Sequence, residues 1–138
     1  MSRAAGAGAS TPSRVSLWGP VALYMALIFW VSSMSSPPAP GAVNDKLLHF
    51  ACYGGLAALI LRATAGGRLA GVTRSAALLA WAIATAYGAT DEVHQRFVPF
   101  RSAEFADLAA DALGAALAVA VLGASGIIAR SRQAARLR

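Results

Sequence analysis

Four long apolar stretches, separated by short polar segments, run along the chain and cover residues 15–33, 46–65, 75–94 and 104–129. Each holds close to the twenty or so residues that an α-helix needs to cross the hydrocarbon core of a bilayer. The segments between them are a Ser/Pro-rich stretch, the turn-rich basic sequence AGGRLAGVTR and a loop around Pro99. This pattern predicts an all-α fold, a four-helix polytopic transmembrane bundle.

The two ends of the chain differ from this membrane domain of residues 15–129. Residues 1–14 are rich in Ala, Gly and Ser and have no periodic apolar pattern, which predicts a disordered basic tail. Residues 130–138 carry four arginines and predict a second basic tail. The chain therefore divides into one membrane domain and two short tails.

Composition agrees with a membrane protein. Hydrophobic residues make up 57% of the chain, and only 13% of residues are charged, against about 25% in soluble domains. The net charge of +6 comes from arginines scattered among apolar runs, without a basic helix face, so we expect no nucleic-acid partner. The single cysteine, Cys52, excludes an internal disulfide and a cysteine-based zinc site.

Basic residues indicate the orientation of the helices. With both termini in the cytoplasm, the inner side holds nine basic residues and the outer side three. The inner residues are Arg3, Arg14, Arg62, Arg68, Arg74, Arg130, Arg132, Arg136 and Arg138; the outer ones are Lys46, Arg96 and Arg101. Because cytoplasmic loops are enriched in Lys and Arg, both termini are predicted to be cytoplasmic.

Acidic residues have the opposite distribution, since all six fall at the predicted outer ends of the helices together with both histidines. Residues three or four apart share a helix face. This spacing groups Asp45, His49 and Tyr53 on the second helix, Glu92 and Gln95 on the third, and Glu104, Asp107 and Asp111 on the fourth. An unpaired carboxylate at the bilayer centre costs about 2.5–3.5 kcal/mol, so Asp111 in particular should face the bundle and be paired.

We therefore predict a polar cluster at the outer end of the bundle, centred on His49, Glu92, Arg101, Asp107 and Asp111. The full set of candidate site residues is Asp45, His49, Tyr53, Asp91, Glu92, Gln95, Arg101, Asp107 and Asp111. Structural roles compete with binding roles at several of them: either Asn44 or Asp45 can cap the second helix, and Asp91 can simply end a helix among headgroups. The default partner of His49 is a carboxylate, with metal ligation as the minority interpretation.

The loop between the third and fourth helices combines aromatic and basic side chains. Phe97 and Phe100 can enter the membrane interface while Arg96 and Arg101 meet phosphate oxygens. The same two arginines can instead neutralise the neighbouring carboxylates. Both interpretations are compatible with the sequence.

Two blocks of this region, DKLLHFACYGGLA and DEVHQRFVPFRSAEFADLAADALGA, resemble the VanZ-like family of small membrane proteins, which takes its name from an accessory protein of glycopeptide (teicoplanin) resistance. The matching positions are Asp45, Lys46, His49, Phe50, Tyr53, Asp91, Glu92, Gln95, Pro99, Arg101, Asp107 and Gly114. Two positions depart from the family pattern: Asp111 stands where asparagine is usual, and Phe100 where glycine often precedes the arginine. The resemblance implies a multi-pass protein of the bacterial cytoplasmic membrane, but no settled activity.

Three functions fit these observations. The favoured hypothesis is a non-enzymatic envelope protein that binds or shields a lipid-linked phosphate or peptidoglycan-related ligand at the outer leaflet and modulates glycopeptide sensitivity. A metal-dependent enzyme acting on a phosphate-bearing lipid is an alternative, although no compact metal motif such as H-E-x-x-H is present. A structural subunit of a membrane complex is the third. We assign no catalytic residue, cofactor or metal ligand from the sequence.

Overall fold

The computed structural model describes residues 11–37 and 44–137, and only helices occur as regular elements within these ranges. There are four α-helices and one short 3-10 helix: α1 (Arg14–Ser32), α2 (Asp45–Thr64), η1 (Leu69–Gly71), α3 (Arg74–Gln95) and α4 (Phe105–Arg136). The all-α prediction is confirmed. The predicted disorder of the N-terminal tail falls mostly on residues outside the described ranges.

Three of the four long helices have a side-chain N-cap. In each case the cap lies where a loop sequence gives way to an apolar run. Ser13, Asn44 and Thr73 accept backbone N–H groups of α1, α2 and α3 at 3.1, 2.9 and 3.1 Å. These bonds satisfy donors that the first turn of a helix leaves free. The N-cap of α2 is therefore Asn44, and the side chain of Asp45 remains available.

The start of α4 is capped differently. Glu104 makes no capping bond with its own side chain, and its backbone N–H donates to Glu92 Oε2 of α3 at 2.8 Å. This contact ties the beginning of α4 to the end of α3. At its other end α4 continues to Arg136, so the helix passes through the expected boundary at residue 129 and includes most of the segment that we predicted as a basic tail.

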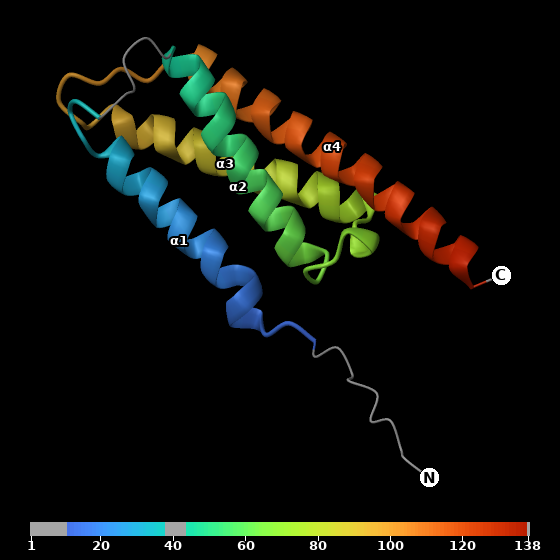
Figure 1. Cartoon of the computed structure of the whole chain (residues 1–138). Coiled ribbons are helices and arrows are strands. Elements are labelled where there is room, and N and C mark those ends of the chain that lie inside the picture. Colours follow the sequence, from blue (N-terminus) through green and yellow to red (C-terminus); the bar gives the residue numbers. More distant parts are fainter. Residues whose placement is uncertain (1–10, 38–43, 138) are drawn as a thin grey trace.

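The helices alternate in direction (Figure 1). The end of α1, the start of α2, the end of α3 and the start of α4 consequently lie at one end of the molecule, which we call the outer end. All six acidic residues belong to these helix ends or to the loop before α4. The alternation therefore gathers groups that lie up to 66 positions apart in the sequence, from Asp45 to Asp111.

Helix α2 packs most closely against α4. A Cβ atom added at Gly114 would overlap the carbonyl oxygen of Phe50, and one added at Gly54 would lie 3.1 Å from the carbonyl oxygen of Gly114. Such close approach of two backbones is the role of small residues in membrane helix packing. The buried core centres on α2, with Tyr53, Leu56, Ala57, Ile60 and Leu61 nearly inaccessible.

Three helices, α1, α2 and α4, are long and apolar enough to span a membrane. Helix α3 has 22 residues, but its last turns hold Asp91, Glu92, His94 and Gln95, and these polar residues dilute its hydropathy. The structure thus supports a membrane protein with four long helices, of which three have the composition of independent spans.

Candidate functional site

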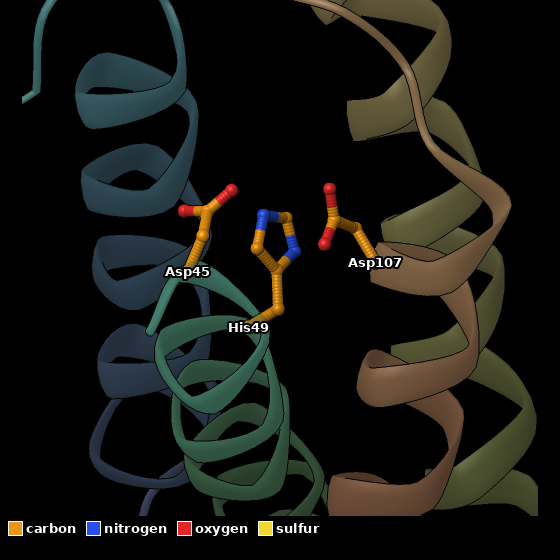
Figure 2. A group of neighbouring side chains, drawn as sticks. All are labelled: Asp45, His49 and Asp107. Atoms are coloured by element: carbon orange, nitrogen blue, oxygen red, sulfur yellow. The ribbon is translucent and has the colours of Figure 1, made fainter. Parts of the chain in front are cut away.

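His49 and Asp111 form the buried centre of the outer end. His49 Nδ1 lies 3.0 Å from Asp111 Oδ1, in a hydrogen bond between α2 and α4. Asp111 is completely inaccessible and His49 is 8% exposed. Figure 2 shows the imidazole between the carboxylates of Asp45 and Asp107. The expectation that Asp111 faces the bundle and has a polar partner agrees with this geometry.

Gly88 of α3 provides the space that Asp111 occupies. A Cβ atom at position 88 would lie 2.5 Å from Asp111 Oδ2 and 3.1 Å from its carboxyl carbon. Any other residue at position 88 would therefore push the carboxylate out of place. Helix α3 closes one side of the site because it lacks a side chain at this point.

Lys46 forms a second polar group nearer the surface. Its Nζ atom lies 2.6 Å from Glu104 Oε2 and 2.7 Å from Asp107 Oδ1. The ammonium group lowers the pKa of the exposed Glu104 carboxyl by hydrogen bonding and by charge. Lys46 is absent from the predicted site because it follows Asp45 directly and falls off the Asp45–His49–Tyr53 face. The sequence signal that could have placed Lys46 in the site is its positive charge at the outer end, among the acidic residues.

Gln95 connects the third helix to its neighbours. Its amide nitrogen donates to Asp91 Oδ2 at 3.0 Å and to Ser32 Oγ of α1 at 3.1 Å, while its oxygen accepts from Arg101 at 3.0 Å. Gln95 and Asp91 are 2% and 6% exposed. The alternative in which Asp91 simply ends the helix among headgroups is therefore wrong, because this side chain is buried and bonded.

A cavity of about 280 Å³ lies beside this network, between α1, α2 and α3. Its apolar wall comes mainly from α1, with Leu27, Ile28 and Val31. Its polar lining consists of Ser32, Asp45, His49, Tyr53, Asp91, Gln95 and Arg101, together with the more weakly polar Tyr24 and Cys52. The hydroxyl of Tyr53 is buried and has no hydrogen-bond partner. The cavity thus has one apolar side and one polar side.

Three carboxylate oxygens near His49 are also buried without hydrogen-bond partners: Glu92 Oε1, Asp107 Oδ1 and Asp111 Oδ2. Asp107 Oδ1 is paired with Lys46 in a salt bridge, whereas no lysine or arginine pairs with the other two among the described residues. His49, Glu92 and Asp111 each offer a ligand atom within 4.8 Å of the other two. Asp45, His49 and Asp107 form another such group, in which Asp45 is exposed. His49 belongs to both groups, so it is the common element of the possible cation sites among the described residues.

The loop between α3 and α4 contains one unusual backbone conformation. Phe100 has φ of 63°, in the left-handed region that favours glycine. Its ring is 97% exposed, so packing does not hold it there. This conformation explains why glycine is suited to the position before the arginine, and it directs Arg101 back toward Gln95.

The predicted site residues fall into three connected parts of the outer end. His49, Glu92 and Asp111 lie at the buried centre, and Asp107 joins Lys46 beside it. Tyr53, Asp91, Gln95, Arg101 and Asp45 line the cavity. The other histidine, His94, lies apart: its Nε2 atom is 3.0 Å from Ser33 Oγ, and its ring packs on Phe29 of α1. Ser32, the partner of Gln95, was not expected because α1 carries no charged residue after Arg14.

Searches of curated proteins and of solved structures found no significant match. Comparison with models of protein families, in contrast, matches residues 15–126 to the family described as VanZ/LLP1. The matched region includes α2, α3, nearly all of α1, α4 as far as residue 126, and every residue of the outer-end cluster. Because it covers most of the chain, it confirms the resemblance seen in the sequence, and the protein belongs to the VanZ/LLP1 family.

Proposed function

We propose that the protein crosses the bacterial cytoplasmic membrane four times, with both termini in the cytoplasm and the outer end at the outer leaflet. The excess of basic residues at the opposite side supports this orientation. The exposed rings of Trp30, Phe97, Phe100 and Phe105 at the outer end suit an interfacial aromatic belt. Helix α3 crosses with its polar residues facing the other helices rather than lipid.

In this orientation the protein binds an amphipathic, phosphate-bearing lipid whose head also carries hydroxyl or amide groups, such as a lipid-linked sugar or a peptidoglycan precursor. The observation that carries this proposal is the cavity itself, with an apolar wall on α1 and a polar lining from α2, α3 and the loop after α3. Ligand cavities commonly combine an apolar lining with a few placed polar groups.

The charges of the cavity indicate how such a head would be held. Among the lining residues that the structure describes, Arg101 is the only lysine or arginine, and guanidinium groups suit phosphate oxygens. Asp45 and Asp91 would repel phosphate but accept hydrogen bonds from hydroxyl and amide groups. The combination favours a head with both kinds of group over a simple phosphate ester. Sequestering a peptidoglycan precursor would alter sensitivity to glycopeptides.

Binding can be measured with the full chain in lipid nanodiscs, using a polyprenyl diphosphate disaccharide as the probe and a phospholipid as the comparison lipid. Arg101→Gln should weaken probe binding by about tenfold, since hydrogen bonds to charged groups contribute about 1.5–3 kcal/mol. Arg96→Gln is the matched control, because Arg96 is exposed in the same loop and lies outside the cavity lining. Equal affinities for all three proteins would contradict the proposed site.

The corresponding cellular test compares glycopeptide sensitivity of bacteria that produce the wild type, Arg101→Gln or Arg96→Gln at equal levels. We expect Arg101→Gln to behave like cells without the protein and Arg96→Gln to behave like the wild type. A change in sensitivity that follows protein abundance alone would instead favour the structural-subunit hypothesis.

A second candidate function is metal-dependent catalysis on the same class of lipid. The unpartnered carboxylate oxygens beside His49 favour it, because a divalent ion can activate water next to a phosphate. An assay for phosphate or diphosphate release, with and without a chelator, separates this enzyme from a binding protein. Release that is abolished by the chelator and restored by added metal would establish catalysis.

A further inference from the structure

We propose that His49, Glu92 and Asp111 form a binding site for one divalent transition-metal cation, with Zn²⁺ as the best-fitting ion. The site goes beyond the proposed lipid binding, because an ion can bind there whether or not a lipid occupies the cavity. The three side chains come from α2, α3 and α4, and their ligand atoms lie within 4.8 Å of one another.

The burial of these groups points to a ligand rather than to a solvated acidic patch. Asp111 is 0% exposed, Glu92 7% and His49 8%. Asp111 Oδ2 and Glu92 Oε1 have no hydrogen-bond partner. Buried polar atoms in proteins are nearly always paired, and two free carboxylate oxygens beside an imidazole are a donor set that a cation would complete.

Charge leads to the same conclusion. Lys46 pairs with Glu104 and Asp107, and Arg101 donates to Gln95. Within the described residues, no lysine or arginine forms an ion pair with Glu92 or Asp111. With both carboxyl groups ionised, the site would hold about two negative charges beside the His49 imidazole, which a divalent ion neutralises.

The surrounding contacts orient two of the three ligands, Glu92 and Asp111. Glu92 Oε2 accepts the backbone N–H of Glu104 at 2.8 Å, which leaves Oε1 free. Asp111 is confined by Gly88, whose missing side chain leaves room for Oδ2. Hydrogen bonds that fix the orientation of ligating carboxylates are typical of metal sites.

The donor set favours a transition metal. An imidazole with two carboxylates suits Zn²⁺, while Mg²⁺ and Ca²⁺ prefer sites built from oxygen alone. Three protein ligands also leave a coordination position for water or a ligand oxygen, and His49 lines the cavity. The other group, Asp45, His49 and Asp107, is less suited because Asp45 is exposed and Lys46 already neutralises Asp107.

The test is a calorimetric titration of the metal-free, untagged full chain in detergent with Zn²⁺ alone. Elemental analysis then measures the bound metal. We expect one ion per chain. Asp111→Asn and Glu92→Gln keep side-chain size and should each weaken binding at least tenfold, by analogy with the losses seen when supporting groups of metal sites are removed. Asp45→Asn is the matched control and should bind as the wild type does.

Folding is monitored separately by circular dichroism and by the thermal midpoint, measured with and without Zn²⁺. Zinc should raise the midpoint of the wild type and Asp45→Asn, and at the same zinc concentration it should raise that of Asp111→Asn and Glu92→Gln by clearly less. If one of these two variants fails to fold, the other still tests the site. The proposal is overturned if the wild type binds no zinc, if both variants retain its affinity, or if Asp45→Asn loses it.

Discussion

The two faces of helix α2 differ in what they contact. Toward α4, adjacent helices meet backbone to backbone through Gly54 and Gly114. Toward α1, contact is made by the end of a flexible side chain, since a Cβ at Gly55 would meet the Tyr24 hydroxyl at 2.9 Å. Only Val21 and Ser32 of α1 are buried. The comparison indicates that the α2–α4 contact beneath the polar cluster is packed backbone to backbone, whereas α1 meets α2 through side chains.

The way α1 is held bears on the proposed lipid binding. Lipid tails are as apolar as leucine side chains, so apolar contacts alone hold a helix weakly against its neighbours in a bilayer. Polar contacts hold helix α1 along its length: Ser32 and Ser33 bond to Gln95 and His94 at the outer end. Farther along, the Tyr87 hydroxyl donates to the Met25 carbonyl at 2.7 Å, and Arg62 donates to the Ser16 carbonyl at 3.1 Å.

The largest effect should come from Gly114→Ala, because the new methyl group would overlap the Phe50 carbonyl oxygen. We expect the free energy of unfolding to fall by about 3 kcal/mol, the upper end of the usual cost of overpacking. Reversible unfolding in mixed micelles measures this change. Gly123→Ala is the matched control on the same helix, since nothing lies within 4 Å of its added Cβ. Equal stability of the two variants would contradict a close α2–α4 contact.

A smaller effect should distinguish the neighbouring glycines of α2. Gly54→Ala faces the Gly114 carbonyl and should cost about 2 kcal/mol, because the backbone of α4 has to move. Gly55→Ala faces the Tyr24 ring, which can rotate away, and should cost less than about 1 kcal/mol. Unfolding of both variants under the same conditions provides the measurement. The comparison between the faces fails if Gly55→Ala is the more destabilised protein.

The smallest predicted change is a gain in stability from Phe100→Gly. Phe100 lies in the loop between α3 and α4, outside both faces of α2. Relief of the left-handed conformation should raise the free energy of unfolding by about 0.5 kcal/mol, the roughly 1–2 kcal/mol of strain being partly offset by the greater freedom of glycine in the unfolded chain. The exposed ring loses almost no packing. Unfolding of the variant and the wild type should be compared in detergent and in bilayers. A loss of stability would show that Phe100 makes contacts that the isolated chain lacks, such as insertion into lipid.

The four helices and the outer-end cluster could be predicted because apolar runs and helical spacing are local properties of the sequence. The opposed distributions of arginines and carboxylates identified which helix ends belong together. Asp111 was informative because burying a carboxylate in an apolar helix requires a partner. The bond partners of Asp91 and the role of Lys46 could not be predicted, since each depends on the rotation of one helix against another.

The close contacts of the glycines could not be predicted from the sequence either. Gly54, Gly88 and Gly114 could be recognised as small residues, but the sequence does not say which one meets a backbone carbonyl and which one meets a carboxylate. The boundary of α4 was misplaced for a simpler reason. The arginines after Ala129 end the apolar run, but they are good helix formers and extend the helix to Arg136.

The central claim is that the polar groups of the outer end converge inside the bundle, and the pair of His49 and Asp111 tests it most directly. Unfolding free energies of His49→Leu, Asp111→Leu and the double variant form a double-mutant cycle. We predict a coupling energy of at least about 1 kcal/mol, because each single substitution leaves the other group buried without its partner. Additive effects, within about 0.5 kcal/mol, would mean that the two side chains do not meet and would contradict the account.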